Sequence, residues 1–462
     1  MAHAANPQHE FPNPTAGLLL WSCEARIRKR IVILQSCNGP VSLLLILLIL
    51  LQPFPAQAYA VLTHEQIIDM AWDDSIRPLL LSRYPRLTND ELKEAHAYAF
   101  GGSAIQDLGY YPFSHEFFSN LAHYVRTGDF IGSLFRNARN ANELAFAIGA
   151  LSHYVGDNIG HSECVNPATA IEFPKLAKKY GADVTYDESP HGHVRTEFAF
   201  DIAQLNQHHL APASYLRYIG LRVPVPQLER AFYETYGLHL REVLGPEFPA
   251  MRSYRSSVRR FIPRIAHAET VLHHNVPPEV QDNALAVFQN NIQNADYQKR
   301  WSGAHKRPGF VTHLLAVFIF VLPKIGTLSD LAIRGPNEET QQWYVESVNH
   351  TLTQFRDILH NLREHPGSAL ALANRDLDTG ALVRPGAYKL TDETYATLLG
   401  RITAQPDRQV PFGIRRDLVA FYADPKAPIA TKKNPGAWAR VQSQLLALQH
   451  MSVRNPSGLT SY

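Results

Sequence analysis

The stretch ALSHYVGDNIGHSE, residues 150–163, places His153, Asp157 and His161 at intervals of four. Residues four apart lie on one face of an α-helix, with Cβ atoms roughly 5–6 Å apart. At that separation two imidazoles, or an imidazole and a carboxylate, reach the same cation. Zinc accepts histidine nitrogen and carboxylate oxygen at about 2.0–2.2 Å. The stretch therefore predicts a helix that carries metal ligands along one face.

A second stretch, HGHVRTEFAFD at residues 191–201, repeats the interval with His193 and Glu197. The residues around His153 also predict burial, because Leu144, Ile148, Leu151 and Val155 form an apolar stripe on the same helix. A buried histidine or aspartate must be paired or coordinated, since an isolated buried charge is very costly. Two such ligand sets in one chain predict a metallohydrolase.

The rest of the chain predicts an all-α fold. Helical spacing of apolar residues recurs over residues 64–84, Thr88 offers a cap for residues 91–102, and Asn140 or Asn142 starts the helix of His153. Alternating strands and a doubly wound sheet both lack support in the sequence. We expect a multi-helix bundle with additional helices in the C-terminal part.

Composition excludes several classes of function. The net charge is +2, which gives no strong bulk field for nucleic acid, so no specific nucleic-acid binding is expected. The three cysteines, Cys23, Cys37 and Cys164, provide neither a disulfide framework nor a thiolate zinc site. Neither G-x-S-x-G nor a P-loop is present, so serine hydrolases and nucleoside triphosphatases are disfavoured.

The N-terminal residues predict export. A basic patch at residues 26–30 precedes an apolar stretch at 41–51, and Ala-Gln-Ala at 56–58 is a cleavage signal. The apolar stretch is short for a transmembrane helix, so a retained membrane anchor is the lesser alternative. Cleavage would make Tyr59 the new N-terminus, with its amino group close in sequence to His64 as a possible metal ligand.

Five quoted segments, in this order, carry a family resemblance: THEQII (63–68), AIQDLGYYPF (104–113), LAHYVRTGDF (121–130), HYVGDNIGH (153–161) and the later HxxxE. The order resembles the zinc-dependent phospholipase C family, which shares its helical scaffold with a family of single-strand nucleases. The resemblance covers residues 59–205. It implies an all-α domain with zinc ions, two to three per chain, at the base of a cleft.

The resemblance also implies which residues bind metal and which one acts on water. Asp107 resembles an early aspartate that binds metal and orients or deprotonates the attacking water. One further histidine ligand lies between Asp107 and His153, and His123 is preferred to His115 because His115 follows a Pro-Phe turn. The candidate metal ligands are Tyr59, His64, Asp107, His115, His123, His153, Asp157, His161, His193 and Glu197.

The sequence and this resemblance therefore predict an exported zinc-dependent phosphodiesterase that hydrolyses phospholipid head groups. The alternatives are a single-strand nuclease on the same scaffold and a non-catalytic metal-binding surface protein. We expect three parts: residues 1–58 as the basic region and signal peptide, 59–335 as the helical catalytic domain, and 336–462 as a mostly helical C-terminal region. The expected partner is a phospholipid or other phosphodiester, with possible peripheral membrane contact, and the sequence indicates no oligomeric state.

Two features of the later sequence lie outside this resemblance. Residues 310–323, FVTHLLAVFIFVLP, form the most apolar stretch after the signal region and predict a buried helix, or alternatively an interfacial segment. Asp376, Asp378 and Thr379 offer oxygen atoms at a spacing similar to that of a calcium-binding loop, but residues for the remaining ligand positions are missing. We therefore expect a turn before a helix at that point.

Overall fold

The computed structural model describes residues 60–245, 247–263, 266, 283–301, 335–424 and 426–454. By its internal contacts the chain divides after Pro53, and all of these residues belong to the second unit. The unit is all-α, as the sequence predicts. The signal region at 1–58, Tyr59 and the apolar stretch at 310–323 lie outside the described residues. Among the described helices, none has the length and apolar character needed to cross a membrane.

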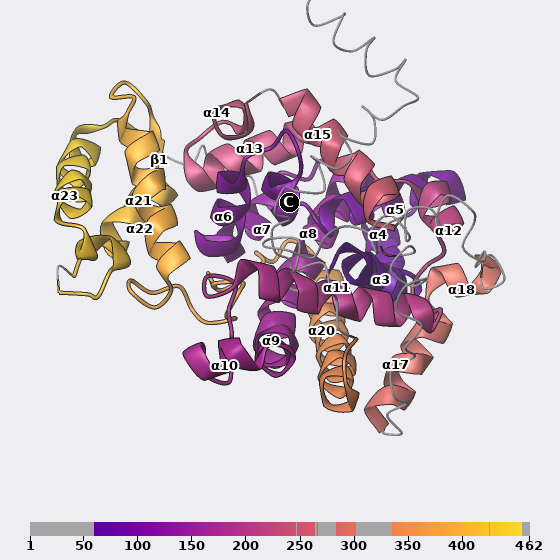
Figure 1. Ribbon diagram of the computed structural model, residues 1–462. Coiled ribbons are helices and arrows are strands. Elements are labelled where there is room, and N and C mark those ends of the chain that lie inside the picture. Colours follow the sequence, from indigo (N-terminus) through magenta and orange to yellow (C-terminus); the bar gives the residue numbers. More distant parts are fainter. Residues whose placement is uncertain are drawn as a thin grey trace, which may run out of the picture. The chain divides into compact units, whose positions relative to one another are not determined.

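Helix α8 (Ala141–Gly160) lies among the other helices of the N-terminal half (Figure 1). The Asn140 side chain caps it by accepting a hydrogen bond from the Glu143 backbone N–H at 2.9 Å. Most of its residues are buried, including the entire segment from Ala145 to Asp157, so the predicted buried helix is confirmed. Its packing partners are α3 (Val61–Ala71), α4 (Arg77–Arg83), α5 (Asn89–Gly102), α7 (Thr127–Arg136) and α20 (Glu338–Glu364).

Helices α5 and α8 cross at glycines. A Cβ atom on Gly149 would lie 2.1 Å from the Ala99 carbonyl oxygen, and one on Gly102 would lie 2.1 Å from that of Phe146. Only residues without side chains allow the two backbones to approach this closely. A capping box begins α5, because the Thr88 hydroxyl accepts from the Glu91 N–H while the Glu91 carboxylate accepts from the Thr88 N–H.

Two of the helices continue through π-helical turns. Helix α3 runs through such a turn at Trp72–Ile76 into α4, and α8 runs through His161–Val165 into α9 (Asn166–Glu172). A π-helical turn inserts a residue into the helical register and is often found at functional sites. The second turn begins at His161, so it sets the direction of the last candidate ligand on this continuous helix.

Further helices lie between α5 and α20 in the described chain. They are α6 (Glu116–Tyr124), α10 (Pro174–Tyr180), α11 (Pro190–Asn206), α12 (Ala213–Ile219), α13 (Val225–Tyr236), α14 (Leu240–Leu244), α15 (Glu247–Ser256), α17 (Asn283–Asn294) and α18 (Asp296–Trp301). A 3₁₀ turn at Gln106–Tyr110 follows α5, and a further π-helical turn at Ser257–Phe261 follows α15.

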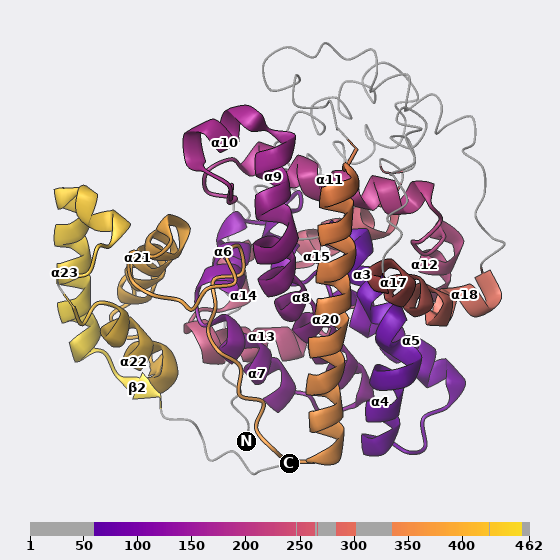
Figure 2. The same cartoon turned by 90° about the horizontal axis from the view of Figure 1, so that it is seen from below.

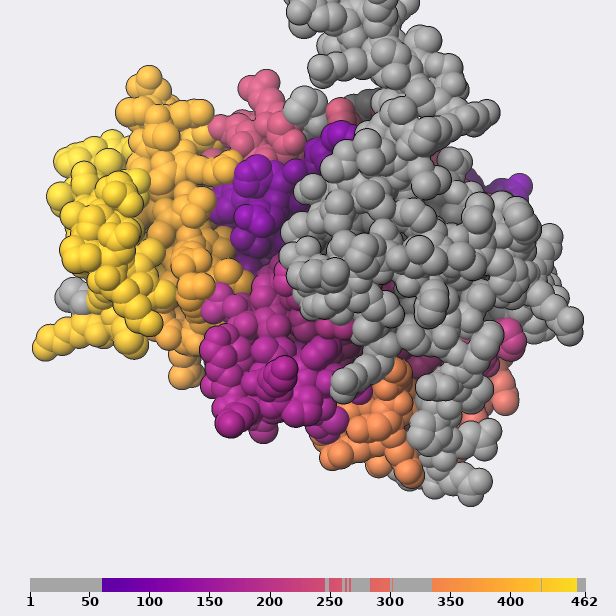
Figure 3. Space-filling view, viewed as in Figure 1, coloured from indigo at the N-terminus to yellow at the C-terminus, as the bar shows by residue number. Residues whose placement is uncertain are grey.

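The C-terminal residues are mostly helical and pack on this arrangement. Helix α20 lies alongside α8 and α9 (Figure 2) and contacts α8 directly. It is followed by α21 (Lys389–Thr403), α22 (Phe412–Phe421), a 3₁₀ turn at Ala430–Lys433 and α23 (Pro435–His450). A two-residue parallel pair joins β1 (Val410–Pro411) to β2 (Val453–Arg454). The surface of α21 adjoins that of α6 (Figure 3), and these helices are in contact. The domain boundary at residue 336 stays a prediction.

Candidate metal centre

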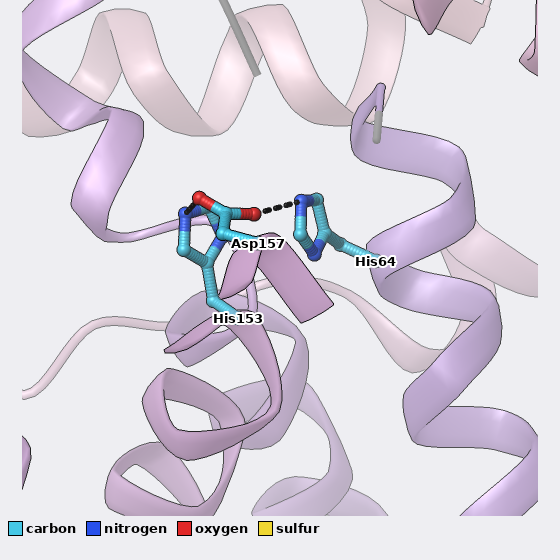
Figure 4. A group of neighbouring side chains, drawn as sticks. All are labelled: His64, His153 and Asp157. Carbon is cyan, nitrogen blue, oxygen red and sulfur yellow. Dashed lines mark ion pairs between the residues drawn. The ribbon is translucent and has the colours of Figure 1, made fainter. Parts of the chain in front are cut away.

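The first group of candidate ligands joins helices α3 and α8. His64 comes from α3, and His153 and Asp157 come from successive turns of α8. The Asp157 carboxylate lies between the two imidazoles (Figure 4), with Oδ1 3.4 Å from His64 Nε2 and Oδ2 2.9 Å from His153 Nε2. The two rings stack with centroids 4.3 Å apart. All three side chains are fully buried.

The second group shares His153 with the first and adds Asp107 and His123. Asp107 lies in the 3₁₀ turn, which is fixed to α8 because the neighbouring Gln106 side chain donates to the Ala150 carbonyl at 2.9 Å. His123 lies near the end of α6. Its Nε2 is 3.5 Å from Asp107 Oδ1 and 3.3 Å from Asp157 Oδ2. Asp157 therefore faces three imidazoles, and the first two groups form one continuous cluster.

The third group consists of His161, His193 and Glu197. His161 opens the π-helical turn after α8, whereas His193 and Glu197 lie one turn apart on α11. Glu197 Oε1 is 2.9 Å from His193 Nδ1 and 3.6 Å from His161 Nε2. Helix α11 is held beside α9 by a hydrogen bond from the Thr169 hydroxyl to that of Thr196 at 3.1 Å.

Backbone and amide oxygens fix the proton on one nitrogen of four rings. In three rings Nδ1 donates to a backbone carbonyl at 2.7–2.9 Å. His153 donates to Ser103, His123 donates to Ser119, and His161 donates to Leu377. His193 Nε2 donates to the Asn166 side-chain oxygen at 2.8 Å. The other nitrogen of each ring faces carboxylates, which is the arrangement that orients histidine toward a metal.

The distances within the groups fit zinc. Tetrahedral zinc with bonds of about 2.0–2.1 Å places its ligand atoms about 3.3–3.4 Å from one another. Within the three groups, the nitrogen atoms that face a carboxylate lie 2.9–3.6 Å from its oxygen. These nitrogens are Nε2 of His64, His123, His153 and His161, and Nδ1 of His193. His153 Nε2 and His193 Nδ1 stand 2.9 Å from a carboxylate oxygen, while the other nitrogen of each ring donates its hydrogen bond elsewhere. These residues therefore fit a cation, and the chemistry of the donors fits zinc.

Burial sets the protonation of the rings in the metal-free protein. It lowers the pKa of His153 to about 4, against the charge of Asp157, and holds the pKa of His193 well below the ordinary value. Burial also opposes protonation of His123, but the hydrogen bond and charge of Asp157 and the charge of Asp107 raise its pKa to about 9. The cluster without metal therefore retains a proton on His123.

The two carboxylates of the cluster differ. Burial raises the pKa of Asp107 well above its ordinary range, although the His123 charge acts in the opposite direction. Burial acts in the same way on Asp157, but the neighbouring imidazoles of His153, His123 and His64 lower its pKa well below that range. In the metal-free cluster, Asp157 is therefore the more acidic of the two carboxyl groups.

The structure places the predicted ligands as follows. Eight of them fall into the three groups: His64, Asp107, His123, His153, Asp157, His161, His193 and Glu197. His115 lies apart from these groups because its exposed ring caps α6, where Nδ1 accepts from the Phe117 N–H at 3.1 Å. Of the two alternatives, the cluster therefore contains His123. Tyr59 lies outside the described residues, and His96 is a core residue that pairs with Asp69 at 2.9 Å.

Two supporting aspartates were missed by sequence reasoning. Asp201 lies one turn beyond Glu197 on α11 and accepts hydrogen bonds from the first turn of α3, including the Thr63 hydroxyl at 2.6 Å. The interval His193–Glu197–Asp201 was a signal for it. Asp378 lies in the predicted turn before α21, with Oδ1 3.8 Å from His161 Nδ1. No sequence interval pointed to Asp378, since more than two hundred residues separate it from His161.

Comparison with known proteins agrees with this geometry. Residues 63–245 match the family described as zinc dependent phospholipase C. The matched segment contains all three ligand groups and ends before α15. Neither a curated protein nor a solved structure matches the chain significantly. The resemblance stated from the sequence is thereby confirmed at the level of the family, and the family together with the ligand groups supports zinc as the metal.

Proposed function

From the match of residues 63–245 to the zinc-dependent phospholipase C family, we propose that the chain is an exported phosphodiesterase that hydrolyses phospholipid head groups. The observation that carries the proposal is the buried cluster in which Asp157 faces His64, His123 and His153. A structural zinc site uses four protein ligands, whereas the third group supplies three. The first two groups supply five residues in all, because they share His153 and only its Nε2 is available to a metal. Fewer than four protein ligands per ion leave a position for water and substrate.

The residues of the cluster have separate roles in this reaction. Zinc, when bound, supplies a water activated at neutral pH and positive charge for the phosphoryl oxygens. The Asp107 carboxyl, which lies between His123 and His153, orients the attacking water and accepts its proton. The water oxygen forms a bond to phosphorus, the bond from phosphorus to the glycerol oxygen breaks, and that oxygen takes up the proton that Asp107 accepted from the water. Asp157 holds the three imidazoles in place.

The aromatic residues next to Asp107 bear on the choice of substrate. A single-strand nuclease on this scaffold needs aromatic faces that stack with bases. Tyr111 is buried and packs on Tyr254 at 5.3 Å between ring centroids, and Tyr110 packs near His123 at 5.9 Å. Because Tyr111 is used in packing, we favour a phospholipid as the phosphodiester substrate over single-stranded nucleic acid.

The test is turnover by the full chain after removal of the signal region and reconstitution with zinc. Substrates are phosphatidylcholine vesicles, with release of the phosphorylated head group as the readout, and single-stranded DNA. The double variant His153→Ala, Asp157→Ala should hydrolyse the substrate at least 100-fold more slowly than the wild type. The control Tyr395→Phe removes a hydrogen bond from a buried tyrosine to the Asp417 carboxylate and should keep the wild-type rate. Turnover on DNA alone would replace phospholipid with nucleic acid. Zinc binding without turnover on either substrate would identify a non-catalytic metal-binding protein.

Export is tested separately on the cellular protein. We expect a mature N-terminus at Tyr59 and recovery of the protein outside the cytoplasm. N-terminal sequencing of the mature chain checks both cleavage and the presence of a free amino group beside the His64 helix. A chain that keeps residues 1–58 and sediments with membranes would instead support the anchored alternative. Release by high salt from vesicles would indicate peripheral membrane contact.

A further inference from the structure

A turn from outside the family-matched segment reaches the metal centre. Residues 374–380 lie between α20 and α21, and an isolated bridge pairs Arg375 with Leu382 at the base of the turn. The Gly380 N–H donates to the Asp376 carbonyl at 2.8 Å. Gly380 has φ +68°, and a Cβ atom there would lie 2.5 Å from the Asn158 carbonyl oxygen of α8. Glycine therefore allows this turn to lie directly against the helix that carries the ligands.

Leu377 connects the backbone of this turn to two candidate ligands. Its carbonyl accepts the hydrogen bond from His161 Nδ1 at 2.7 Å. Its N–H donates to the His123 backbone carbonyl at 3.0 Å, which fixes the peptide relative to α6. Because the Leu377 carbonyl holds the proton on Nδ1, the lone pair of His161 is on Nε2, the nitrogen that faces Glu197.

Asn166 extends the same support to His193. Its side-chain N–H donates to the Asp378 carbonyl at 2.8 Å, so its oxygen is directed toward His193. That oxygen accepts from His193 Nε2 at 2.8 Å and leaves Nδ1 facing Glu197. Both imidazoles of the third group are therefore oriented by hydrogen bonds that end on two consecutive peptides of the turn.

The Asp378 side chain fixes the turn in place. It is buried, and its Oδ2 accepts hydrogen bonds from the hydroxyls of Tyr124 at 2.8 Å and Tyr388 at 2.7 Å. Tyr124 follows His123 on α6, and Tyr388 precedes α21. The remaining oxygen, Oδ1, is 3.8 Å from His161 Nδ1 and places negative charge beside the ring. A carboxylate next to a ligand histidine strengthens the ring as a metal ligand.

We propose that this turn, through the Leu377 carbonyl and Asp378, positions His161 and His193 for metal binding, so that the C-terminal region completes the third ligand group. Asp378 and Asn166 are positioning residues. The proposal rests on the metal site of the proposed function, but concerns one group only. The first two groups have their supporting carbonyls, Ser103 and Ser119, within the matched segment.

The test measures zinc affinity in the full chain by competition with a chromophoric chelator, together with thermal unfolding of the metal-free protein. Asp378→Asn should lower the affinity for one zinc ion by about 10–100-fold, which is the usual effect of losing a residue that supports a metal ligand. Asp417→Asn is the matched control, because the Asp417 carboxylate also accepts from a buried tyrosine, Tyr395, at 2.8 Å, but contacts no ligand. Tyr388→Phe, with Tyr395→Phe as its control, repeats the comparison if the aspartate variant fails to fold.

Double variants assign the weakened ion. In a Glu197→Gln background, where the third group is already impaired, Asp378→Asn should have no further effect; in a His64→Ala background it should retain its full effect. Equal loss in Asp378→Asn and Asp417→Asn, or wild-type affinity in Asp378→Asn, would overturn the positioning role. A selective loss in a protein that hydrolyses no phosphodiester would uphold that role and reject the proposed function. A wild-type protein that binds no zinc would reject both.

Discussion

The ligands around Asp157 and those around Glu197 are supported in different ways. The Ser103 and Ser119 carbonyls that orient His153 and His123 lie within the same matched segment as the ligands. The Leu377 carbonyl that orients His161 lies 216 residues further along the chain. In one part of the metal centre, called the self-contained part below, the carbonyls that orient the rings lie in the N-terminal half. The C-terminal turn contacts the His123 backbone there, whereas in the other part it supplies the carbonyl that orients His161.

The largest effect is expected from Asp157→Ala, which breaks the self-contained part. Asp157 lies within 3.4 Å of three imidazoles, so its removal leaves His64, His123 and His153 without their common carboxylate. We expect loss of zinc from the first two groups and at least a 100-fold loss of turnover. Elemental analysis of purified protein measures the zinc. Retention of zinc at the third group alone would show that the two parts of the metal centre bind metal independently. A zinc content equal to that of the wild type would contradict the role of Asp157.

Gly149→Ala should break the same part through its packing. The added methyl would meet the Ala99 carbonyl, and the nearby Ser103 carbonyl orients His153, so separation of α5 from α8 disturbs the ligand as well. Alanine favours a helix by about 1 kcal/mol, but overpacking of a core typically costs about 1–3 kcal/mol and backbone atoms yield least. We expect a net loss of stability in denaturant unfolding.

Gly436→Ala is the control for this substitution. Gly436 is exposed in α23, and a Cβ atom there meets nothing closer than 3.5 Å. This variant should keep or slightly raise the free energy of unfolding, with unchanged zinc content. Equal stability of the two variants would show that the α5–α8 crossing is not the tight contact described here.

Asp201→Ala should affect the link between α3 and α11. Its carboxylate satisfies the Leu62 and Thr63 N–H groups, and loss of a helix cap costs about 0.5–2 kcal/mol. Because His64 follows directly, we expect weaker zinc binding at the first group in chelator competition. Asn434→Ala removes the cap of α23 and should lower stability by a similar amount without weakening zinc. Equal zinc affinities in the two variants would show that the Asp201 cap does not support the metal site.

The smallest effect is a pH dependence in the C-terminal turn. Burial and the charge of Asp378 raise the pKa of Asp376 to about 8. The folded chain thus keeps a proton that the unfolded chain loses near pH 4, so this contribution to stability is present at low pH and is lost as pH rises through about 8. Between pH 6 and 7 the wild type should lose at most about 1.4 kcal/mol relative to Asp376→Asn. Parallel denaturation profiles for the two proteins would contradict this assignment.

The ligand pairs within α8 and α11 could be predicted from the sequence because their signals are local. The intervals within these helices place pairs of ligands on one helical face, and Asn140 and Thr88 cap helices that begin where expected. The candidates His64, Asp107 and His123 came instead from the order of segments that carries the family resemblance. Within that resemblance, His123 was preferred to His115 because it lies on the stretch FFSNLAHYVRTGDF, which runs into the core, whereas His115 follows a Pro-Phe turn. The helix caps and the ligand intervals use residues fewer than about ten positions apart.

The C-terminal support could not be predicted in the same way. The turn at residues 374–380 was expected as a turn, but its peptides orient His161 and His193 through contacts that no periodicity encodes. The π-helical turn at His161 likewise changes the helical register without a marker such as proline at that residue. Asp201 lies between these cases, since its interval from Glu197 is helical but its partner on α3 is distant in sequence.

The most direct test of the metal centre is anomalous diffraction from crystals of the zinc-loaded mature chain, recorded on both sides of the zinc absorption edge. We expect one peak among His161, His193 and Glu197, and at least one among the ligands that surround Asp157. A double variant His153→Ala, Asp157→Ala should lose the latter peaks and keep the former. An absence of peaks at these residues, with the rings hydrogen-bonded to the carboxylates instead, would contradict the central claim.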